Sequence, residues 1–267
     1  MKLLFPLLAG AALLSASPLF SADDASNPSN VPVPKPLDQP AAGRVPRPPQ
    51  PADVAAPKLG DDGEIQRQFS ILHDGYVALA TKRMPEVVFL GDSITLGWSI
   101  NGKEVFKEFA AYNVANFGIF GDQVQHVLWR VENGEFDGIT PKVVVLMVGT
   151  SNAPVREHLP GEIASGIRKI IDSIHSKSPE TKVLLLAILP RGADPSDKNR
   201  QKNEEVNAMI ANFDDGKTVH FLNVNDKLLQ PDGTLDEKIM PDFLHPSEAG
   251  YRIVADAIRE KLASLLK

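Results

Sequence analysis

The chain has 267 residues, of which 43% are hydrophobic and 23% charged, so it can bury a full core in the way an ordinary globular protein does. Its formal net charge of -6 at pH 7 excludes the clustered Lys and Arg that a nucleic-acid-binding protein needs. Because it contains no cysteine, a disulfide framework and a lipid-bearing cysteine are also excluded.

The first 22 residues have the layout of a secretory signal. Lys2 precedes a short apolar run, and the segment ends in small residues. The run is interrupted and shorter than the roughly 20 residues that a membrane-spanning helix needs. We therefore expect residues 1–22 to be removed, which predicts a secreted or periplasmic protein with no stable membrane insertion. The cleavage point is open, because Phe20 fits poorly three positions before a cut after Ala22.

Residues 23–60 contain proline every few positions and almost no large apolar side chains. Such a segment cannot bury enough surface to offset its ordering entropy, and it favours extended conformations. We therefore predict a proline-rich disordered tether, followed by one folded domain over residues 61–267. The alternatives for this segment are a ligand for a proline-recognising domain and a spacer that crosses the cell wall.

From residue 61 onward, helix and strand patterns alternate. Apolar runs predict strands within residues 86–93, 112–118, 141–150, 181–190 and 218–224. Helical spacing of apolar residues predicts helices within residues 64–83, 104–110, 123–135, 161–177, 200–213 and 246–266. Five strands that alternate with helices indicate an α/β fold with a parallel sheet covered on both faces. In such sheets, ligands bind at the carboxyl ends of the strands.

Small and polar residues follow the first three expected strands. Gly91 allows a sharp turn, after which Ser93 begins a helix whose partially positive N-terminus can stabilise nearby negative charge. In the stretch NFGIFGD, Gly118 and Gly121 let a backbone N–H approach a ligand with no side chain in the way. In VVVLMVGTSNAP, residues 143–154, a buried strand ends in small polar residues. These strand ends are therefore candidates for chemistry.

A carboxylate and an imidazole precede the last expected helix. Asp242 and His245 are three residues apart, a spacing that lets the two groups meet over one turn, and Pro246 suits the first position of the helix. Serine is a poor nucleophile at its ordinary pKa, so His245 would accept the proton of Ser93 while Asp242 orients the imidazole. With N–H donors for an oxyanion, these are the groups that acyl transfer requires.

The motifs GDSIT, NFGIFGD, VGTSN and DFLHPSEAGY resemble the four blocks of the SGNH or GDSL hydrolases, over roughly residues 62 to 265. HVLWRVENGE and ILPRGADPSDKNRQKNEEVNAMI resemble the branch of the platelet-activating-factor acetylhydrolase alpha subunits, which remove short acyl groups. The resemblance implies a three-layer, flavodoxin-like α/β/α fold with a five-stranded parallel sheet. It implies Ser93 as nucleophile, Asp242 and His245 as its partners, and Gly118 as an oxyanion donor beside Ser93. It implies no metal or organic cofactor, and members of the branch often form homodimers.

The third block departs from the family pattern. Its second residue after the glycine is normally an asparagine that completes the oxyanion hole, but here it is Ser151, and Asn152 comes one place later. Three alternatives are open. The hydroxyl of Ser151 serves as donor, or the turn shifts so that Asn152 reaches the hole despite Pro154, or the hole lacks a donor. The last leaves a slowed esterase or a domain that binds acylated ligands without efficient turnover, since one lost donor costs about 100- to 1,000-fold in kcat.

Other polar residues of these segments have simpler interpretations. We expect Asp92 to satisfy backbone N–H groups, Asp122 to cap the next helix, and His126 and Trp129 to pack on one helix face. The remaining histidines show no metal-ligand spacing: His73, His158, His175 and His220. Ile239 and Met240 either line an acyl pocket or fill the core.

These observations predict a secreted or periplasmic serine esterase that hydrolyses short-chain, acetyl-like esters through an acyl-enzyme. Ser93, Asp242 and His245 would be catalytic, and Ser93, Gly118 and either Ser151 or Asn152 would form the oxyanion hole. The leaving alcohol is open. Because the chain is expected to be exported, an O-acetylated polysaccharide is preferred over phospholipid-like esters.

Overall fold

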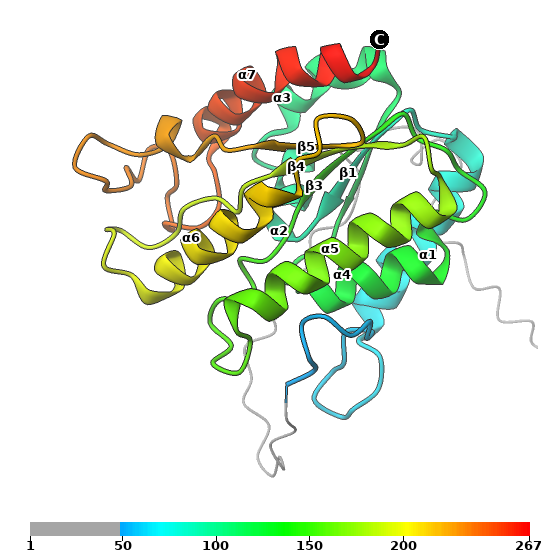
Figure 1. Ribbon diagram of the computed structural model, residues 1–267, viewed down its shortest axis with the longest axis horizontal. Helices are drawn as coiled ribbons and strands as arrows, with labels where there is room; N and C mark the ends of the chain where they lie inside the picture. Colours follow the sequence, from blue (N-terminus) through cyan, green and yellow to red (C-terminus); the bar gives the residue numbers. More distant parts are fainter. Residues whose placement is uncertain (1–48) are drawn as a thin grey trace, which may run out of the picture.

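The computed structural model describes residues 49–267. The predicted signal peptide and most of the predicted tether, residues 1–48, lie outside the described residues. Figure 1 shows a central sheet between two layers of helices, so the predicted three-layer α/β/α architecture is confirmed. No helix in the described part of the chain is long and apolar enough to cross a membrane.

The sheet has five parallel strands in the order β2-β1-β3-β4-β5. The strands are β1 (Val87–Gly91), β2 (Val114–Gly118), β3 (Val143–Met147), β4 (Lys182–Leu186) and β5 (Val219–Leu222). Each strand lies inside its predicted segment. In the register of the sheet, Gly91 pairs with Gly118 on one side and Met147 on the other. The first three strands therefore end at the same level, and the loops that follow them meet at one edge.

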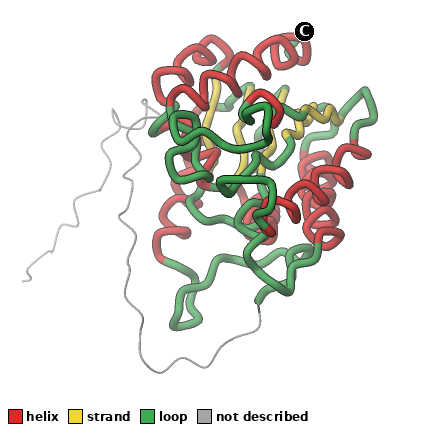
Figure 2. Tube along the Cα trace, turned by 90° about the vertical axis from the view of Figure 1, so that its left-hand side faces the viewer, coloured by secondary structure: helices red, strands yellow, loops and turns green. Residues whose placement is uncertain are grey.

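Helices cover both faces of the sheet (Figures 1 and 2). One hydrophobic cluster joins the sheet to α1 (Arg67–Arg83), α4 (Val124–Arg130), α5 (Pro160–Lys177) and α6 (Lys198–Ile210). A second cluster joins the opposite face to α2 (Ser93–Leu96), α3 (Lys103–Phe106) and α7 (Glu248–Leu265). The shorter helical turns are η2 (Gly97–Ser99), η3 (Lys107–Tyr112), η4 (Val131–Glu135), η5 (Ala211–Phe213) and η6 (Asn225–Lys227). Near-continuous apolar strands are what burial on both faces requires.

The end of the predicted tether is packed on the domain. In residues 49–60, here called the N-terminal strap, Ala52 is fully buried in the first hydrophobic cluster. A Cβ at Gly166 of α5 would lie 2.4 Å from the carbonyl oxygen of Ala52, so the strap and α5 are in close contact. Ala56 N–H donates to the carbonyl of Gln125 at 3.2 Å. The predicted domain boundary at residue 60 is therefore wrong, because small side chains let this backbone pack closely.

Two details around α7 also differ from prediction. Ser247 caps this helix by accepting from Gly250 N–H at 3.3 Å, so Pro246 lies before the cap and not at the first helical position. Met240 is fully buried and Ile239 packs against the same hydrophobic cluster. Of the two interpretations left open for this pair, the structure supports core filling.

A buried ion cluster ties α4 to the ends of β1 and β2. Arg130, at the end of α4, is fully buried and donates to Asp122 Oδ2 at 2.9 Å and to both oxygens of Glu135 at 2.8 and 2.7 Å. It also donates to the carbonyls of Phe117 and Gly91, each at 3.1 Å. Asp122 was predicted to cap α4, but its carboxylate pairs with Arg130, and Gln123 is the cap residue.

Arg130→Met is expected to lower the free energy of unfolding by about 3–5 kcal/mol, because it leaves two buried carboxylates without their cation. Denaturant unfolding measures this loss. Arg259→Met is the matched control, since Arg259 pairs with Glu108 and Asp256 at the surface and such pairs contribute about 0–1 kcal/mol. Equal losses in the two variants would contradict a structural role for the buried cluster.

Candidate active site

Three side chains from distant parts of the chain meet at the carboxyl edge of the sheet. Ser93, the first residue of α2, places its Oγ 2.9 Å from His245 Nε2. His245 Nδ1 lies 2.7 Å from Asp242 Oδ2. In the tautomer that satisfies both contacts, Nε2 accepts from the serine hydroxyl and Nδ1–H donates to the carboxylate. This is the arrangement in which an imidazole can remove a serine proton.

The loop before α7 fixes the imidazole. Asp242 Oδ1 accepts from the backbone N–H groups of Leu244 at 3.1 Å and His245 at 2.7 Å, with Phe243 in the left-handed region at φ 54°. The predicted spacing of three thus brings the two groups together through a tight turn. Burial alone would raise the pKa of Asp242, but the hydrogen bonds from His245 and Leu244 hold that pKa below its ordinary value.

Asp92, the residue before the serine, shapes the turn as predicted. Its side chain accepts from Ile94 N–H at 2.9 Å and caps α2. Burial raises the pKa of Asp92 to about 6. Tyr251 of α7 donates its hydroxyl to the carbonyl of Ile94 at 2.7 Å, so both backbone groups of the second residue of α2 are bonded to side chains outside the helix. Asp92, and not Ser93, is therefore the residue that caps α2.

The loop after β2 changes the expected donor. Gly118 N–H donates to Asn116 Oδ1 at 2.9 Å within β2, so this N–H already has a hydrogen-bond partner. The expectation that Gly118 supplies an oxyanion donor is therefore corrected. Ile119 N–H donates to the carbonyl of Gly91 and Asp122 N–H to that of Ile119, each at 3.2 Å.

Between those two amides lie Phe120 and Gly121, whose N–H groups have no hydrogen-bond partner among residues 49–267. The Phe120 side chain is 54% exposed, and its ring lies 6.3 Å from the His245 ring with the planes 20° apart. The loop therefore lies beside the imidazole. Gly121 has φ 68°, a left-handed conformation that suits glycine.

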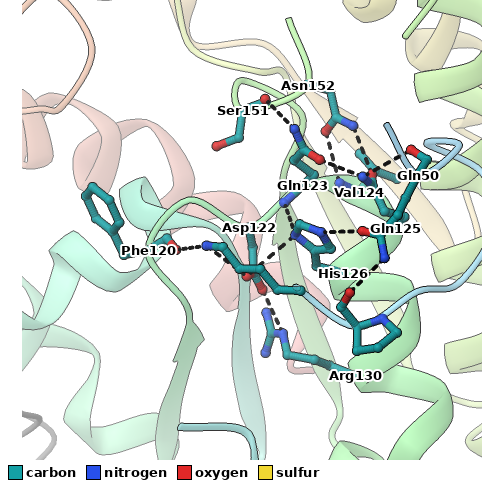
Figure 3. Close-up of polar contacts among 12 residues, drawn as sticks. Gln50, Phe120, Asp122, Gln123, Val124, Gln125, His126, Arg130, Ser151 and Asn152 are labelled. Carbon is teal, nitrogen blue, oxygen red and sulfur yellow. Dashed lines mark hydrogen bonds and ion pairs between the residues drawn. The ribbon is translucent and has the colours of Figure 1, made fainter. Parts of the chain in front are cut away.

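The loop after β3 separates Ser151 from Asn152 (Figure 3). Asn152 is fully buried, and its Oδ1 accepts from Val124 N–H at 3.0 Å at the start of α4. Its Nδ2 donates to Gln125 Oε1 and lies equally close to His158 Nδ1, at 3.1 Å in both cases. The alternative in which Asn152 swings into the oxyanion hole is therefore wrong, because this amide is fully used in holding α4.

Ser151 is partly buried, and its hydroxyl has no hydrogen-bond partner within the described part of the chain. Its backbone is held: Gln123 Nε2 donates to the Ser151 carbonyl at 3.0 Å, and Arg191 Nη1 donates to the Thr150 carbonyl at 2.8 Å. Gly149, at φ 136°, makes the turn out of β3. The backbone that carries Ser151 is thus held in place, while the Ser151 hydroxyl has no partner among the described residues.

Several of these supporting residues were missed in the sequence. Arg191 follows the fourth strand. It could have been identified from the sequence, because ligands bind at the carboxyl ends of the strands and polar residues there are candidates for the site. Gln123 carries no local signal, because its role depends on where the β3 loop lies. His126 and Trp129 pack around Phe69 as predicted, with ring centroids 6.2 and 5.6 Å from it. Across residues 49–267, no group of three or more His, Asp or Glu side chains could hold a metal ion.

Residues 89–253 match the model of the GDSL-like Lipase/Acylhydrolase family. The alpha1 subunit of rat (Rattus norvegicus) platelet-activating factor acetylhydrolase IB is 40% identical over 199 residues, or 73% of this chain and 82% of the relative. The rat alpha2 subunit is 34% identical over 216 residues, or 80% and 92%. A GDSL-like lipase from Bacteroides thetaiotaomicron superposes with a TM-score of 0.60 at 22% identity, covering 72% of this chain and 98% of that structure. The chain therefore belongs to the GDSL-like lipase/acylhydrolase family and is a carboxylic ester hydrolase.

Proposed function

We propose that this protein is a serine esterase that removes short, acetyl-like acyl groups through an acyl-enzyme intermediate. The observation that carries the proposal is the hydrogen-bonded chain from Ser93 through His245 to Asp242, with contacts of 2.9 and 2.7 Å. The acyl size is supported by the two related acetylhydrolase subunits.

In the first step, Ser93 Oγ attacks the ester carbonyl while His245 Nε2 takes its proton. Asp242 stabilises the imidazolium that results. The tetrahedral intermediate then collapses, and His245 gives the proton to the leaving alcohol. In the second step, His245 takes a proton from water, the hydroxide attacks the acyl-enzyme, and the acid leaves as Ser93 regains its proton.

The oxyanion of both intermediates is held by Gly121 N–H and by the hydroxyl of Ser151. Gly121 takes the place expected for Gly118, because its N–H has no hydrogen-bond partner among the described residues. Ser151 takes the place of the family's asparagine, because its hydroxyl is free in the same part of the chain whereas the amide of Asn152 is fully bonded. Both groups lie on loops at the carboxyl edge that Ser93 shares.

The leaving group proposed is a sugar hydroxyl of an O-acetylated polysaccharide. The exposed ring of Phe120 beside His245 offers a flat apolar surface at the place where the alcohol departs. A sugar ring has an apolar face of matching shape. Export from the cell, predicted from residues 1–22, would bring the enzyme to such substrates.

Acetate release from acetylated xylan and from a short-chain phospholipid-like acetyl ester tests this proposal. We expect the polysaccharide to be hydrolysed and the lipid ester to be a poor substrate, with para-nitrophenyl acetate preferred over longer acyl chains. Phe120→Ala should weaken hydrolysis of the polysaccharide more than that of para-nitrophenyl acetate, because only the former has a ring to stack. Preference for the lipid ester would exclude the polysaccharide.

A further inference from the structure

Lys58 of the N-terminal strap reaches the loop that carries Gly121. Its Nζ donates to the carbonyl of Phe120 at 2.5 Å and lies 3.9 Å from Asp122 Oδ1. A Cβ on Gly121 would lie 2.9 Å from the same nitrogen, so the ammonium packs directly against that glycine. A cation from a segment far back in the sequence thus touches three consecutive residues of the loop.

The carbonyl of Phe120 and the N–H of Gly121 belong to one peptide group. That group is planar and trans, and no cis peptide bond occurs among the described residues, so its C=O and N–H point in opposite directions. Fixing the carbonyl toward Lys58 therefore fixes the N–H of Gly121 away from Lys58. A cation on the carbonyl also polarises the peptide, which strengthens its N–H as a donor.

We propose that Lys58 is a positioning residue for catalysis: it orients and polarises the Gly121 peptide as an oxyanion donor. The inference rests on the proposed function, in which Gly121 N–H binds the oxyanion. The charge strengthens a backbone donor of a hole in which serine stands in place of asparagine at position 151.

The strap is anchored so that Lys58 can hold this position. Gln50 Oε1 accepts from His126 Nε2 at 3.2 Å, and the Gln50 carbonyl accepts from His158 Nε2 at 2.7 Å. Asp53 receives two bonds from Lys169 of α5, at 2.7 and 2.9 Å. Burial lowers the pKa of Lys58, whereas the nearby Asp122 carboxylate favours its charged form. The cation therefore keeps a partner at the loop that it orients.

The test compares Lys58→Met with Lys169→Met in the full chain, using para-nitrophenyl acetate and thermal unfolding. Both variants remove one lysine contact of the strap, but only Lys58 touches the loop. We expect Lys58→Met to lower kcat and kcat/KM together by about 10-fold or more, a fraction of the cost of deleting an oxyanion donor. Lys169→Met should leave both constants within about 2-fold of native, with any effect confined to Tm. Lys58→Arg should recover part of the loss, since it restores a cationic donor.

Three results would overturn the proposal. One is native kcat in a folded Lys58→Met variant, and another is an equal loss of kcat in Lys169→Met, which would mean that undocking of the strap is sufficient. The third is recovery of native kcat in Lys58→Met/Asp122→Asn. The loss in Lys58→Met would then come from the unpaired charge of Asp122 and not from the Phe120–Gly121 peptide. Should Lys58→Met fail to fold, Lys58→Gln takes its place with the same expected loss. Ser93→Ala tests the proposed function separately: an inactive Ser93→Ala beside a fully active Lys58→Met rejects the role of Lys58 alone.

Discussion

Ser93→Ala is expected to lower kcat for para-nitrophenyl acetate by at least about 1,000-fold, since removing a catalytic serine costs about this much or more. The variant lacks the Oγ atom that lies 2.9 Å from His245 Nε2. Its fold should be intact, because α2 is capped by the side chain of Asp92 and not by Ser93. Steady-state hydrolysis and thermal unfolding, measured on the same preparation, separate the two effects.

Ser264→Ala is a suitable control for Ser93→Ala. Ser264 lies on α7 and is exposed, and within residues 49–267 its hydroxyl bonds only to the carbonyl of Lys261, so its replacement should change neither kcat nor Tm appreciably. Residual activity of Ser93→Ala above about a hundredth of native would exclude Ser93 as the nucleophile. A native chain with no activity above the Ser93→Ala level would instead support the alternative of a domain that binds acylated ligands without turnover.

The fold and the Ser93–His245–Asp242 cluster were predictable because both follow from local pattern plus one rule of topology. Apolar runs give the strands, and parallel strands bring their carboxyl ends to one edge, where Ser93 and the residues near α7 must meet. No long-range contact had to be known. The same logic explains why Asp92 was correctly interpreted, since a side chain that caps the next two residues acts within its own turn.

The oxyanion donors were not predictable in this way, because each depends on what its neighbours already bond. Gly118 and Gly121 look equivalent in NFGIFGD, and only the structure shows that Asn116 occupies the first N–H. The sequence leaves Asn152 available as an oxyanion donor, but in the structure its amide bonds to the start of α4. In both cases the decisive partner lies on a side chain whose direction sequence does not give.

The N-terminal strap escaped prediction for a different reason. Its composition is that of a disordered segment, and it holds Ala52 in place of the large apolar residues that signal a core. Packing here depends on a small side chain on the strap opposite Gly166, where two backbones approach closely. Composition measures the average burial that a segment can achieve, so it misses a short piece that docks through a few specific bonds.

Ser151→Asn is expected to raise kcat for para-nitrophenyl acetate by about 10- to 100-fold, which approaches the gain in kcat that one additional oxyanion hydrogen bond provides. The serine hydroxyl has a single hydrogen that rotates, and no partner in residues 49–267 fixes it. An asparagine amide reaches further and carries two donors in a rigid plane. It would stand on a backbone that is already held by Gln123 and Arg191, so little reorganisation is needed. The kcat of purified Ser151→Asn, measured beside native protein, gives the answer.

Ser151→Ala supplies the complementary measurement. If the hydroxyl of Ser151 donates to the oxyanion, Ser151→Ala lowers kcat by about 10-fold or more while Ser151→Asn raises it. A large loss in Ser151→Ala with no gain in Ser151→Asn would mean that serine already provides the full contact, and the expected gain would be wrong. No change in either variant would remove the β3 loop from the oxyanion hole. The stabilisation would then fall to the backbone N–H groups of Gly121 and Ser93, and the effect of Lys58→Met should be correspondingly larger.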